Sequence, residues 1–292
     1  MLKRVTLVLV GLFLTPAFAS SAGAQKVQHE VHSDIPYAEP KNARQTLDVH
    51  ASPAGKNRPV VVWLHGGGWQ QGDKTEVHAK PLAFISNGFV FVSTNYRFYP
   101  AATINEMAAD VAKAIRWVRD HAVEYGGDPN TVFLMGWSAG GQLAALVCTD
   151  DRYLKAEGLA LAMIKGCVPV DGDTYDVQMQ IRDVLAARPT EGYSRKFGDA
   201  ENQKEVSAVT HIAKGKGIPP FAIVHITPHP YTPVQARRLA KALQDAAVPA
   251  TIVAGEGKTH NTLNTDLGLY GDKPTAAIFQ FLESILEKAA GR

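Results

Sequence analysis

The sequence predicts an α/β protein with a mostly parallel sheet of about eight strands and helices on both faces. Three observations support this prediction. Continuous apolar runs such as Pro59–Leu64 and Val132–Met135 alternate with segments of helical periodicity, as expected for strands buried on both sides. The first run leads into the glycines Gly66–Gly68, and the second leads into Gly136–Gly141, a glycine-containing turn followed by an apolar helix-like segment. Strand, loop and helix recur in this order in parallel α/β folds.

The first 24 residues are predicted to be a secretory signal peptide. Lys3 and Arg4 precede an apolar run over residues 5–14, and the small residues Ala22-Gly23-Ala24 follow. Cleavage is expected after Ala24, with Ala19 as the alternative. The apolar run is too short to span a membrane, and no cysteine follows it to carry a lipid. We therefore expect a secreted or periplasmic protein without a membrane anchor, with its mature domain in residues 25–292.

Composition excludes several classes of partner. Loss of Lys3 and Arg4 with the signal peptide leaves 28 basic and 28 acidic residues. A near-neutral chain gives no reason to expect nucleic acid or an anionic lipid surface as a partner. The 46% hydrophobic composition suits one large domain. Cys148 and Cys167 lie in apolar segments, which favours buried free thiols, although a disulfide between them stays open in an oxidising compartment.

The elements before the nucleophile turn follow from local patterns. The His29-Glu30-Val31-His32 segment lacks the spacing of a helical zinc motif, so we interpret it as an exposed N-terminal strand. Alternation over residues 45–50 predicts an antiparallel edge strand. We expect a helix over residues 78–87, a buried strand over 88–94 and an amphipathic helix over 103–124.

The elements after the turn include one interruption of the strand-helix rhythm. A sixth strand is expected over residues 159–170, ending in Asp171. We expect residues 172–216 to form a small cap insertion, with an amphipathic helix near residues 177–185 and a loop-like stretch over 188–203. Such an insertion would lie over the carboxyl ends of the strands, where open α/β sheets bind ligands. Beyond it we expect strands over 221–226 and 250–254, separated by a helix with Thr232 at its N-cap and Pro233 in its first turn.

The chemistry is predicted at three places. Ser138 lies at the tip of the turn Gly136-Trp137-Ser138-Ala139-Gly140, where small neighbours tolerate a strained backbone and leave the hydroxyl exposed. Backbone N–H groups of Ala139 and of Gly66, Gly67 or Gly68 would form an oxyanion hole. His260 follows the last strand on a glycine-containing loop, the position expected for a general base that comes after the serine in the chain.

These residues resemble a known superfamily. His65-Gly66-Gly67-Gly68-Trp69, Gly72-Asp73-Lys74, Asn95-Tyr96-Arg97 and the turn around Ser138 are similar to motifs of the α/β-hydrolase superfamily. Within it, the chain from about Asp34 onward resembles HGGGW-type carboxylesterases, which include hormone-sensitive-lipase-like esterases, feruloyl and acetyl-xylan esterases and kynurenine formamidases. The resemblance implies an α/β-hydrolase fold and gives Tyr96 and Arg97 a structural part.

One catalytic position departs from the family. The resemblance implies an aspartate on the loop after the seventh strand, but His229 and Tyr231 occupy that loop and no carboxylate follows until Asp245. Three hypotheses stay open. The acid has moved to the end of the sixth strand, as Asp171 or Asp173; it has moved to Glu256 or Asp266; or Ser138 and His260 act as a dyad. We favour Asp171, although a role as a turn or N-cap residue is nearly as common for an aspartate in this position.

The sequence thus predicts a serine carboxylesterase for small or aryl esters, with no metal or organic cofactor. An amidase or peptidase of the same fold is an alternative, but amide hydrolysis demands an efficient acid–base relay, and the missing aspartate argues against it. A non-catalytic binding protein is a third hypothesis. It predicts loss of several catalytic elements, whereas only one is substituted.

Overall fold

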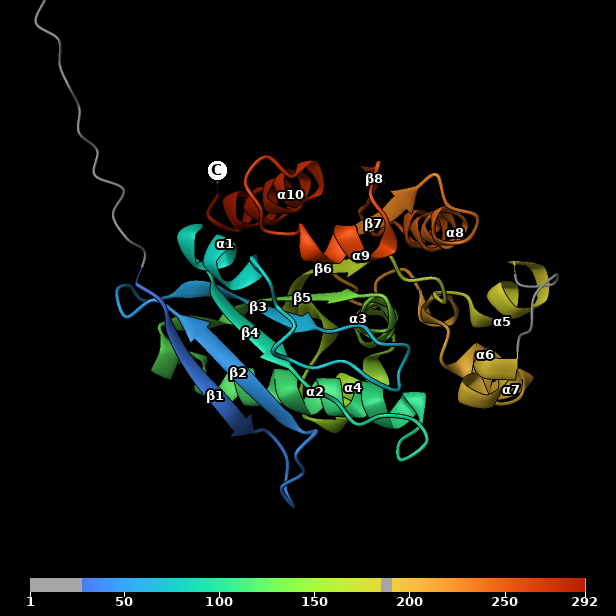
Figure 1. The fold of residues 1–292 in the computed structure, drawn as a ribbon, viewed down its shortest axis with the longest axis horizontal. Coiled ribbons are helices and arrows are strands. Elements are labelled where there is room, and N and C mark those ends of the chain that lie inside the picture. Colours follow the sequence, from blue (N-terminus) through green and yellow to red (C-terminus); the bar gives the residue numbers. More distant parts are fainter. Residues whose placement is uncertain (1–27, 185–190, 292) are drawn as a thin grey trace, which may run out of the picture.

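The computed structural model describes residues 28–184 and 191–291, so the predicted signal peptide lies outside the described residues. Eight strands form one sheet in the order β1-β2-β4-β3-β5-β6-β7-β8 (Figure 1). Strand β2 pairs in antiparallel fashion with β1 on one side and with β4 on the other, and all other pairs are parallel. The predicted fold class is confirmed. The strands are β1 Glu30–Pro36, β2 Thr46–Ala51, β3 Arg58–Leu64, β4 Val90–Thr94, β5 Gly127–Trp137, β6 Ile164–Val170, β7 Phe221–Thr227 and β8 Ala250–Glu256.

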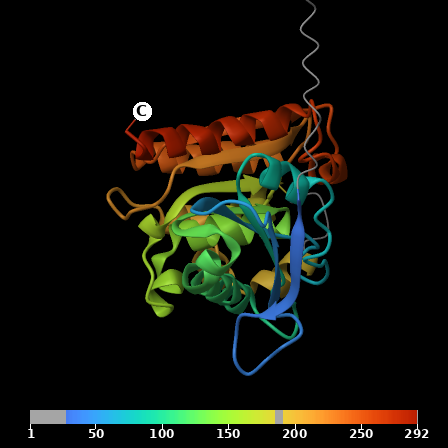
Figure 2. The ribbon, with the colours of Figure 1, turned by 90° about the vertical axis from the view of Figure 1, so that its left-hand side faces the viewer.

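Helices cover both faces of the sheet, as Figures 1 and 2 show. Side chains of α2, α3 and α8 share one hydrophobic cluster with one face, and α1, α9 and α10 contribute to a second cluster on the other. The α-helices are α1 Lys80–Ser86, α2 Ile104–His121, α3 Ala139–Thr149, α4 Asp151–Ala156, α5 Val177–Met179, α6 Glu191–Phe197, α7 Ala200–Glu205, α8 Thr232–Asp245, α9 His260–Thr265 and α10 Lys273–Ala289. Short 3₁₀ turns occupy Ala122–Tyr125, Leu161–Met163 and Ala208–His211, and a π-helix occupies Gln180–Val184.

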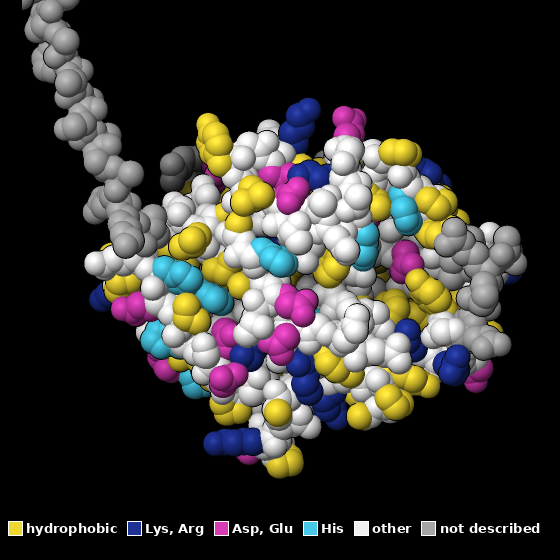
Figure 3. Space-filling view, viewed as in Figure 1, with side chains coloured by type: hydrophobic (Ala, Val, Ile, Leu, Met, Phe, Trp, Pro, Cys, Tyr) yellow, Lys and Arg dark blue, Asp and Glu magenta, His cyan; other side chains and the backbone are white. Residues whose placement is uncertain are grey.

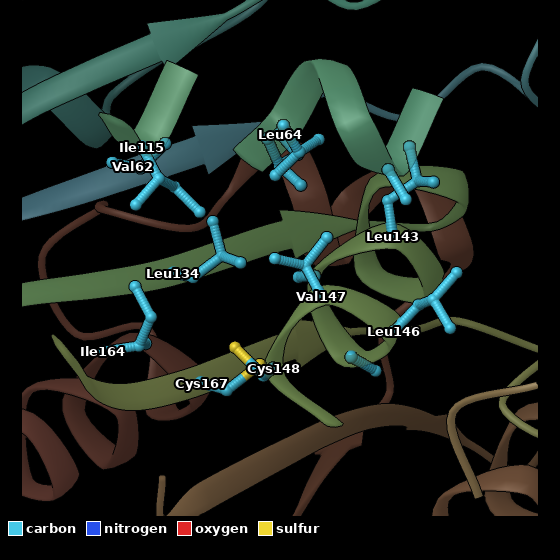
Figure 4. Packing of buried hydrophobic residues seen from close by; sticks show 14 of the residues in the cluster. Val62, Leu64, Ile115, Leu134, Leu143, Leu146, Val147, Cys148, Ile164 and Cys167 are labelled. Atoms are coloured by element: carbon cyan, nitrogen blue, oxygen red, sulfur yellow. The ribbon is translucent and has the colours of Figure 1, made fainter. Parts of the chain in front are cut away.

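The first core cluster holds both cysteines. Figure 4 shows the sulfur atoms of Cys148, from α3, and Cys167, from β6, side by side among aliphatic side chains. Both are free and fully buried. Burial raises the pKa of the Cys167 thiol well above its ordinary value. The prediction of buried free thiols is therefore confirmed.

Several predicted boundaries were wrong for physical reasons. Strand β2 is an interior strand, because β1 pairs with its outer side and forms the edge instead. The stretch 188–203 contains α6 and α7 rather than only loop. Asp199 caps α7 by accepting a hydrogen bond from the N–H of Asn202. The helix expected over 103–124 ends at His121 and continues as a 3₁₀ turn.

Two further boundaries differ. The helix expected near 177–185 divides into α5 and the π-helix. Helix α8 begins at Thr232 itself, so Tyr231 occupies the N-cap position, while Pro233 lies in the first turn as expected.

The described surface shows mixed charge. On the face in Figure 3, acidic and basic side chains are interspersed. Within residues 28–184 and 191–291, none of the helices is both long and apolar enough to cross a bilayer.

Candidate active site

The turn that carries Ser138 joins β5 to α3 and is strained. Ser138 has φ 55° and ψ −118°, a conformation that a residue with a side chain rarely adopts. A Cβ added to Gly136 would lie 2.3 Å from the carbonyl oxygen of Gly140, and one added to Gly140 would lie 2.4 Å from that of Leu64. The backbones therefore approach so closely that glycine is required at both positions, as the sequence pattern predicted.

The structure brings Ser138, His260 and Asp171 together in a hydrogen-bonded line. His260 Nε2 lies 3.0 Å from Ser138 Oγ, and His260 Nδ1 lies 2.6 Å from Asp171 Oδ2. If the proton is on Nδ1, Nε2 is left as an acceptor for the serine hydroxyl, which is the arrangement a general base needs. These residues come from the ends of three elements: β5, β6 and the start of α9.

Asp171 is held by both the backbone and its carboxylate. Its N–H donates to the carbonyl of Val224 at 2.7 Å, and its Oδ1 accepts from the N–H of Ile226 at 3.0 Å. The side chain is fully buried, whereas 41% of the His260 side chain is exposed. Asp171 also has a positive φ, 51°. The fixed carboxylate therefore orients an imidazole that stays open to the solvent side.

The other candidates for the acid lie elsewhere. His229 Nδ1 accepts from the N–H groups of Tyr231 and Thr232 at 3.3 Å, so it caps the start of α8. Asp266 forms an ion pair with Lys258 at 2.8 Å. Glu256 is exposed at the end of β8. Asp173 binds Tyr193 rather than His260.

His260 is also fixed from its backbone side. It is the first residue of α9, which Thr259 caps by accepting the N–H of Thr262 at 3.1 Å. The indole Nε1 of Trp137 donates to the His260 carbonyl at 3.1 Å, and the two rings lie 4.7 Å apart. Trp137 occupies the variable position of the turn motif, and nothing in that pattern predicts this contact.

The glycine loop and the start of α3 surround the serine. Gly67 and Gly68 line the cleft at Ser138. Gly66 instead packs tightly, since a Cβ there would lie 2.4 Å from the Trp137 ring. Ala139 is the first residue of α3, so its N–H has no partner within the helix and lies at the positive end of the helix dipole.

His65 supports this loop from beneath. Its ring stacks on Tyr96 at 4.5 Å, and Nδ1 lies 2.6 Å from the carbonyl of Gly66. Arg44 Nη2 lies 3.2 Å from Nε2. Because arginine can only donate, Nε2 is the acceptor and Nδ1 carries the proton that binds Gly66. Burial lowers the pKa of His65 to about 4, which keeps the ring neutral.

Arg44 joins His65 to the Gly72-Asp73-Lys74 segment. It donates to Asp73 at 2.9 Å, to the carbonyl of Gly72 at 3.0 Å and to Asn95 at 3.0 Å. No sequence motif points to Arg44, which lies in a polar stretch before β2. Tyr96 and Arg97 have the structural part expected of them: Tyr96 donates to the His65 carbonyl and Arg97 binds Asp110.

An open cleft of about 730 Å³ gives access to the serine. Most of the residues that line it are polar or glycine. The full lining is Gly67, Gly68, Gln70, Gln71, Gly72, Glu76, Trp137, Ser138, His260 and Asn261. No group of three or more His, Cys, Asp or Glu side chains in the described residues could hold a metal ion. Ser138, His260 and Asp171 together supply the nucleophile, the base and the acid that nucleophilic acyl transfer requires.

Comparisons with known proteins agree with this geometry. Residues 47–243 match the BD-FAE family. Esterase LipQ of Mycobacterium tuberculosis is 26% identical over 275 residues, which cover 89% of this chain and 63% of LipQ. The probable carboxylic ester hydrolase LipM of the same organism is 31% identical over 218 residues, 70% of this chain and 49% of LipM. The chain thus spans between half and two thirds of the length of these relatives.

A solved structure shows the same fold. Esterase B of Lactobacillus rhamnosis, with a bound inhibitor, superposes with a TM-score of 0.72 at 19% identity, covering 91% of both chains. The family match extends from β2 to α8 and includes the nucleophile turn, the glycine loop and Asp171. The chain therefore belongs to the BD-FAE family of α/β-hydrolase carboxylesterases.

Proposed function

We propose that this protein is a serine carboxylesterase that hydrolyses small or aryl carboxylic esters through an acyl-enzyme on Ser138. The observation that carries the proposal is the hydrogen-bonded line from Ser138 through His260 to Asp171. Membership of a carboxylesterase family supports the same reaction class. Asp171 is the proposed acid, in place of the aspartate that the resemblance implies on the loop after the seventh strand.

The proposed reaction starts at the serine hydroxyl. His260 Nε2 takes the proton of Ser138 Oγ as the oxygen attacks the ester carbonyl, while Asp171 holds Nδ1–H and stabilises the imidazolium. The carbonyl oxygen gains negative charge and accepts hydrogen bonds from the N–H groups of Ala139 and of the glycine loop, in which Gly67 and Gly68 line the cleft. His260 then returns the proton to the leaving alcohol. Water, activated by His260, releases the acid from Ser138.

The cleft supports a compact substrate with a polar or aryl leaving group. Gln70, Gln71 and Asn261 line the cleft and can form hydrogen bonds with a substrate, and the Trp137 ring offers an apolar surface beside the serine. Glu76, which is exposed, also lines the cleft. A carboxylate in this position disfavours leaving groups that carry negative charge.

We also propose that residues 172–216 act as a small cap over the site. Phe197 of α6 packs edge to face on Trp69 at 4.8 Å, next to the glycine loop. Figure 1 shows α5, α6 and α7 together beyond the end of the sheet toward which β3 and β5 point. Ligands of open α/β sheets bind at that end.

The test is hydrolysis of p-nitrophenyl acetate and butyrate by the mature protein. Ser138→Ala and His260→Ala should abolish turnover above background, and Asp171→Asn should lower kcat by about 10⁴-fold, the cost of losing the anion that orients the base. Normal turnover by Asp171→Asn, with the other two variants inactive, would leave a Ser138–His260 dyad. An unmodified protein no more active than Ser138→Ala would contradict the esterase proposal.

Export to the periplasm or the medium is a separate proposal that rests on residues 1–24. Sequencing the N-terminus of the protein recovered from each cell fraction tests it. The expected first residue is Gln25, in material outside the cytoplasm. Recovery of the intact chain beginning at Met1 in the cytoplasm alone would refute it.

A further inference from the structure

A hollow of about 170 Å³, here called the side pocket, lies beside the cleft that leads to Ser138. The described residues that line the side pocket are Gln70, Tyr99, Gly192, Arg195 and Lys196. Gln70 also lines the catalytic cleft, so the two hollows adjoin at this residue. The side pocket can therefore receive one part of a substrate whose ester group lies at the serine.

The loop residues that line the side pocket are fixed by backbone hydrogen bonds. The N–H of Gln70 donates to the carbonyl of Gly67 at 3.2 Å, which ties Gln70 to the loop proposed to bind the oxyanion. The N–H of Tyr99 donates to the carbonyl of Trp69 at 2.9 Å. Gln70 and Tyr99 are therefore held next to the glycine loop.

The other lining residues come from helix α6, which packs on the same loop. The rings of Phe197 and Tyr193 meet the Trp69 ring edge to face, with centroid distances of 4.8 Å and 6.2 Å. Lys196 Nζ lies 5.8 Å from the centre of the Trp69 ring, within the range of a cation–π interaction. These contacts hold the cap helix against the residue that precedes Gln70.

Two basic side chains give the side pocket its charge. Arg195 and Lys196 lie three and four residues after Gly192, so the three residues share one face of α6. Burial and the charge of Arg195 lower the pKa of Lys196, while Asp173 acts in the opposite direction. None of the described residues that line the side pocket is acidic. An anion bound there would offset the repulsion between the two cations.

The catalytic cleft carries the opposite charge. Among the described residues that line the cleft, Glu76 is the one acidic residue, and it does not line the side pocket. A negative charge on the substrate is therefore favoured in the side pocket and disfavoured in the cleft. Since Glu76 disfavours an anionic leaving group, the negative charge belongs on the acyl part of the ester.

We propose that the side pocket binds a carboxylate at the far end of the acyl chain, so that the protein prefers half-esters of dicarboxylic acids to neutral esters of the same length. This inference rests on the proposed esterase function and names the acyl group that the site selects. Lys196 and Arg195 supply the positive charge. The side chains of Gln70 and Tyr99 can donate further hydrogen bonds to the carboxylate.

The experiment compares kcat/KM for mono-p-nitrophenyl adipate and for p-nitrophenyl hexanoate, whose acyl chains have the same number of carbon atoms. The corresponding suberate and octanoate repeat the comparison with a longer chain. The rate with Ser138→Ala is subtracted to remove spontaneous hydrolysis. The unmodified protein should prefer the half-ester in at least one pair by about tenfold, from two cations that contribute about threefold each.

A substitution at Lys196 tests the source of this preference. Lys196→Met should lower the preference by about threefold, whereas Lys196→Arg keeps the charge and should retain it. The preference is a ratio, so damage from the lost contact between Lys196 and Trp69 affects both esters and cancels. Lys204→Met is the matched control, because Lys204 is an exposed lysine of the neighbouring helix α7 and lines neither hollow. It should keep the full preference.

Two outcomes would overturn this inference alone, provided that the unmodified protein is active and Ser138→Ala is not. One is equal kcat/KM for the half-ester and the neutral ester in both pairs. The other is an unchanged preference in Lys196→Met, since the carboxylate would then be bound elsewhere.

If the unmodified protein is no more active than Ser138→Ala, the esterase proposal fails, and binding tests the side pocket without turnover. Calorimetric titration of Ser138→Ala with monomethyl adipate and with methyl hexanoate measures it. Tighter binding of the half-ester, lost when Lys196→Met is added, would support the pocket. Equal binding of the two esters would refute it.

Discussion

Lys80 is a buried cation whose replacement should change how stability depends on pH. Its side chain is fully buried, with Nζ 2.8 Å from the carbonyl of Asn264 and 4.6 Å from the centre of the Trp63 ring. Burial lowers the pKa of Lys80 from 10.5 to about 7, and no acidic group in the described part of the chain offsets this effect. The perturbation is Lys80→Met, which keeps the length of the side chain and removes the charge.

The sign follows from proton binding. Between pH 7 and 10.5 the unfolded chain holds a proton on Lys80 that the folded chain has lost, so the free energy of unfolding rises with pH in this window. This increase in the free energy of unfolding is complete above pH 10.5, and it is lost as the pH falls to 7. The whole shift corresponds to roughly 5 kcal/mol. Since only part of the window is accessible, the unmodified protein should gain about 2 kcal/mol relative to Lys80→Met between pH 7 and pH 9.

The assay is urea unfolding, followed by tryptophan fluorescence, at pH 6, 7, 8 and 9. The difference in unfolding free energy between the unmodified protein and Lys80→Met should be constant below pH 7 and should then grow in favour of the unmodified protein. Lys56→Met is the control, because the Lys56 side chain is exposed, and its difference should not change with pH. A constant difference for Lys80→Met over the whole range would refute the reasoning.

Three further outcomes are expected. Gly140→Ala places a Cβ 2.4 Å from the Leu64 carbonyl oxygen, so it should cost more than about 3 kcal/mol of stability or prevent folding. Gly192→Ala, with open space around the added Cβ, should be nearly neutral. Equal melting temperatures of the two variants would contradict the packing argument. The pKa of His65 is lowered from 6.5 to about 4, so between these pH values the unfolded chain binds more protons than the folded chain. The free energy of unfolding, measured from pH 6.5 down to pH 4, should therefore fall by about 3 kcal/mol for the unmodified protein relative to His65→Gln. A thiol reagent should find no reactive cysteine in the native protein and two in urea without reductant, and none in urea would show that Cys148 and Cys167 are joined.

Features that depend on neighbours in the chain could be predicted from the sequence. The turn around Ser138 needs glycines at fixed offsets, and those glycines are visible as a pattern. His260 could be selected because it follows the last strand. Asp171 could be selected because parallel strands bring their carboxyl ends to one edge, so the residue after β6 must lie near the residue after β5.

Features that depend on contacts between distant segments could not be predicted. Helix α6 is polar in sequence and is held by Tyr193 and Phe197 packing on Trp69, more than a hundred residues earlier. Arg44 reaches His65 and Asn95 from a stretch that has no motif. Strand β2 has the alternation of an edge strand, yet β1 covers it. In each case, a tertiary contact decides the outcome, and no local pattern encodes that contact.

The position of Asp171 fixes its distance from Ser138, whereas His260 is carried on a separate helix. Trp137 and Val170 are directly paired in the ladder of β5 and β6, so Ser138 and Asp171 are the next residues on adjacent strands, and Ser138 N–H binds the Val170 carbonyl at 2.8 Å. Their separation is set by the spacing of the sheet and does not change when loops move. His260 alone is carried on a separate short helix. Variation in turnover among related sequences should therefore arise in the residues that anchor α9, and a search for faster variants is best concentrated there rather than on the serine or the acid.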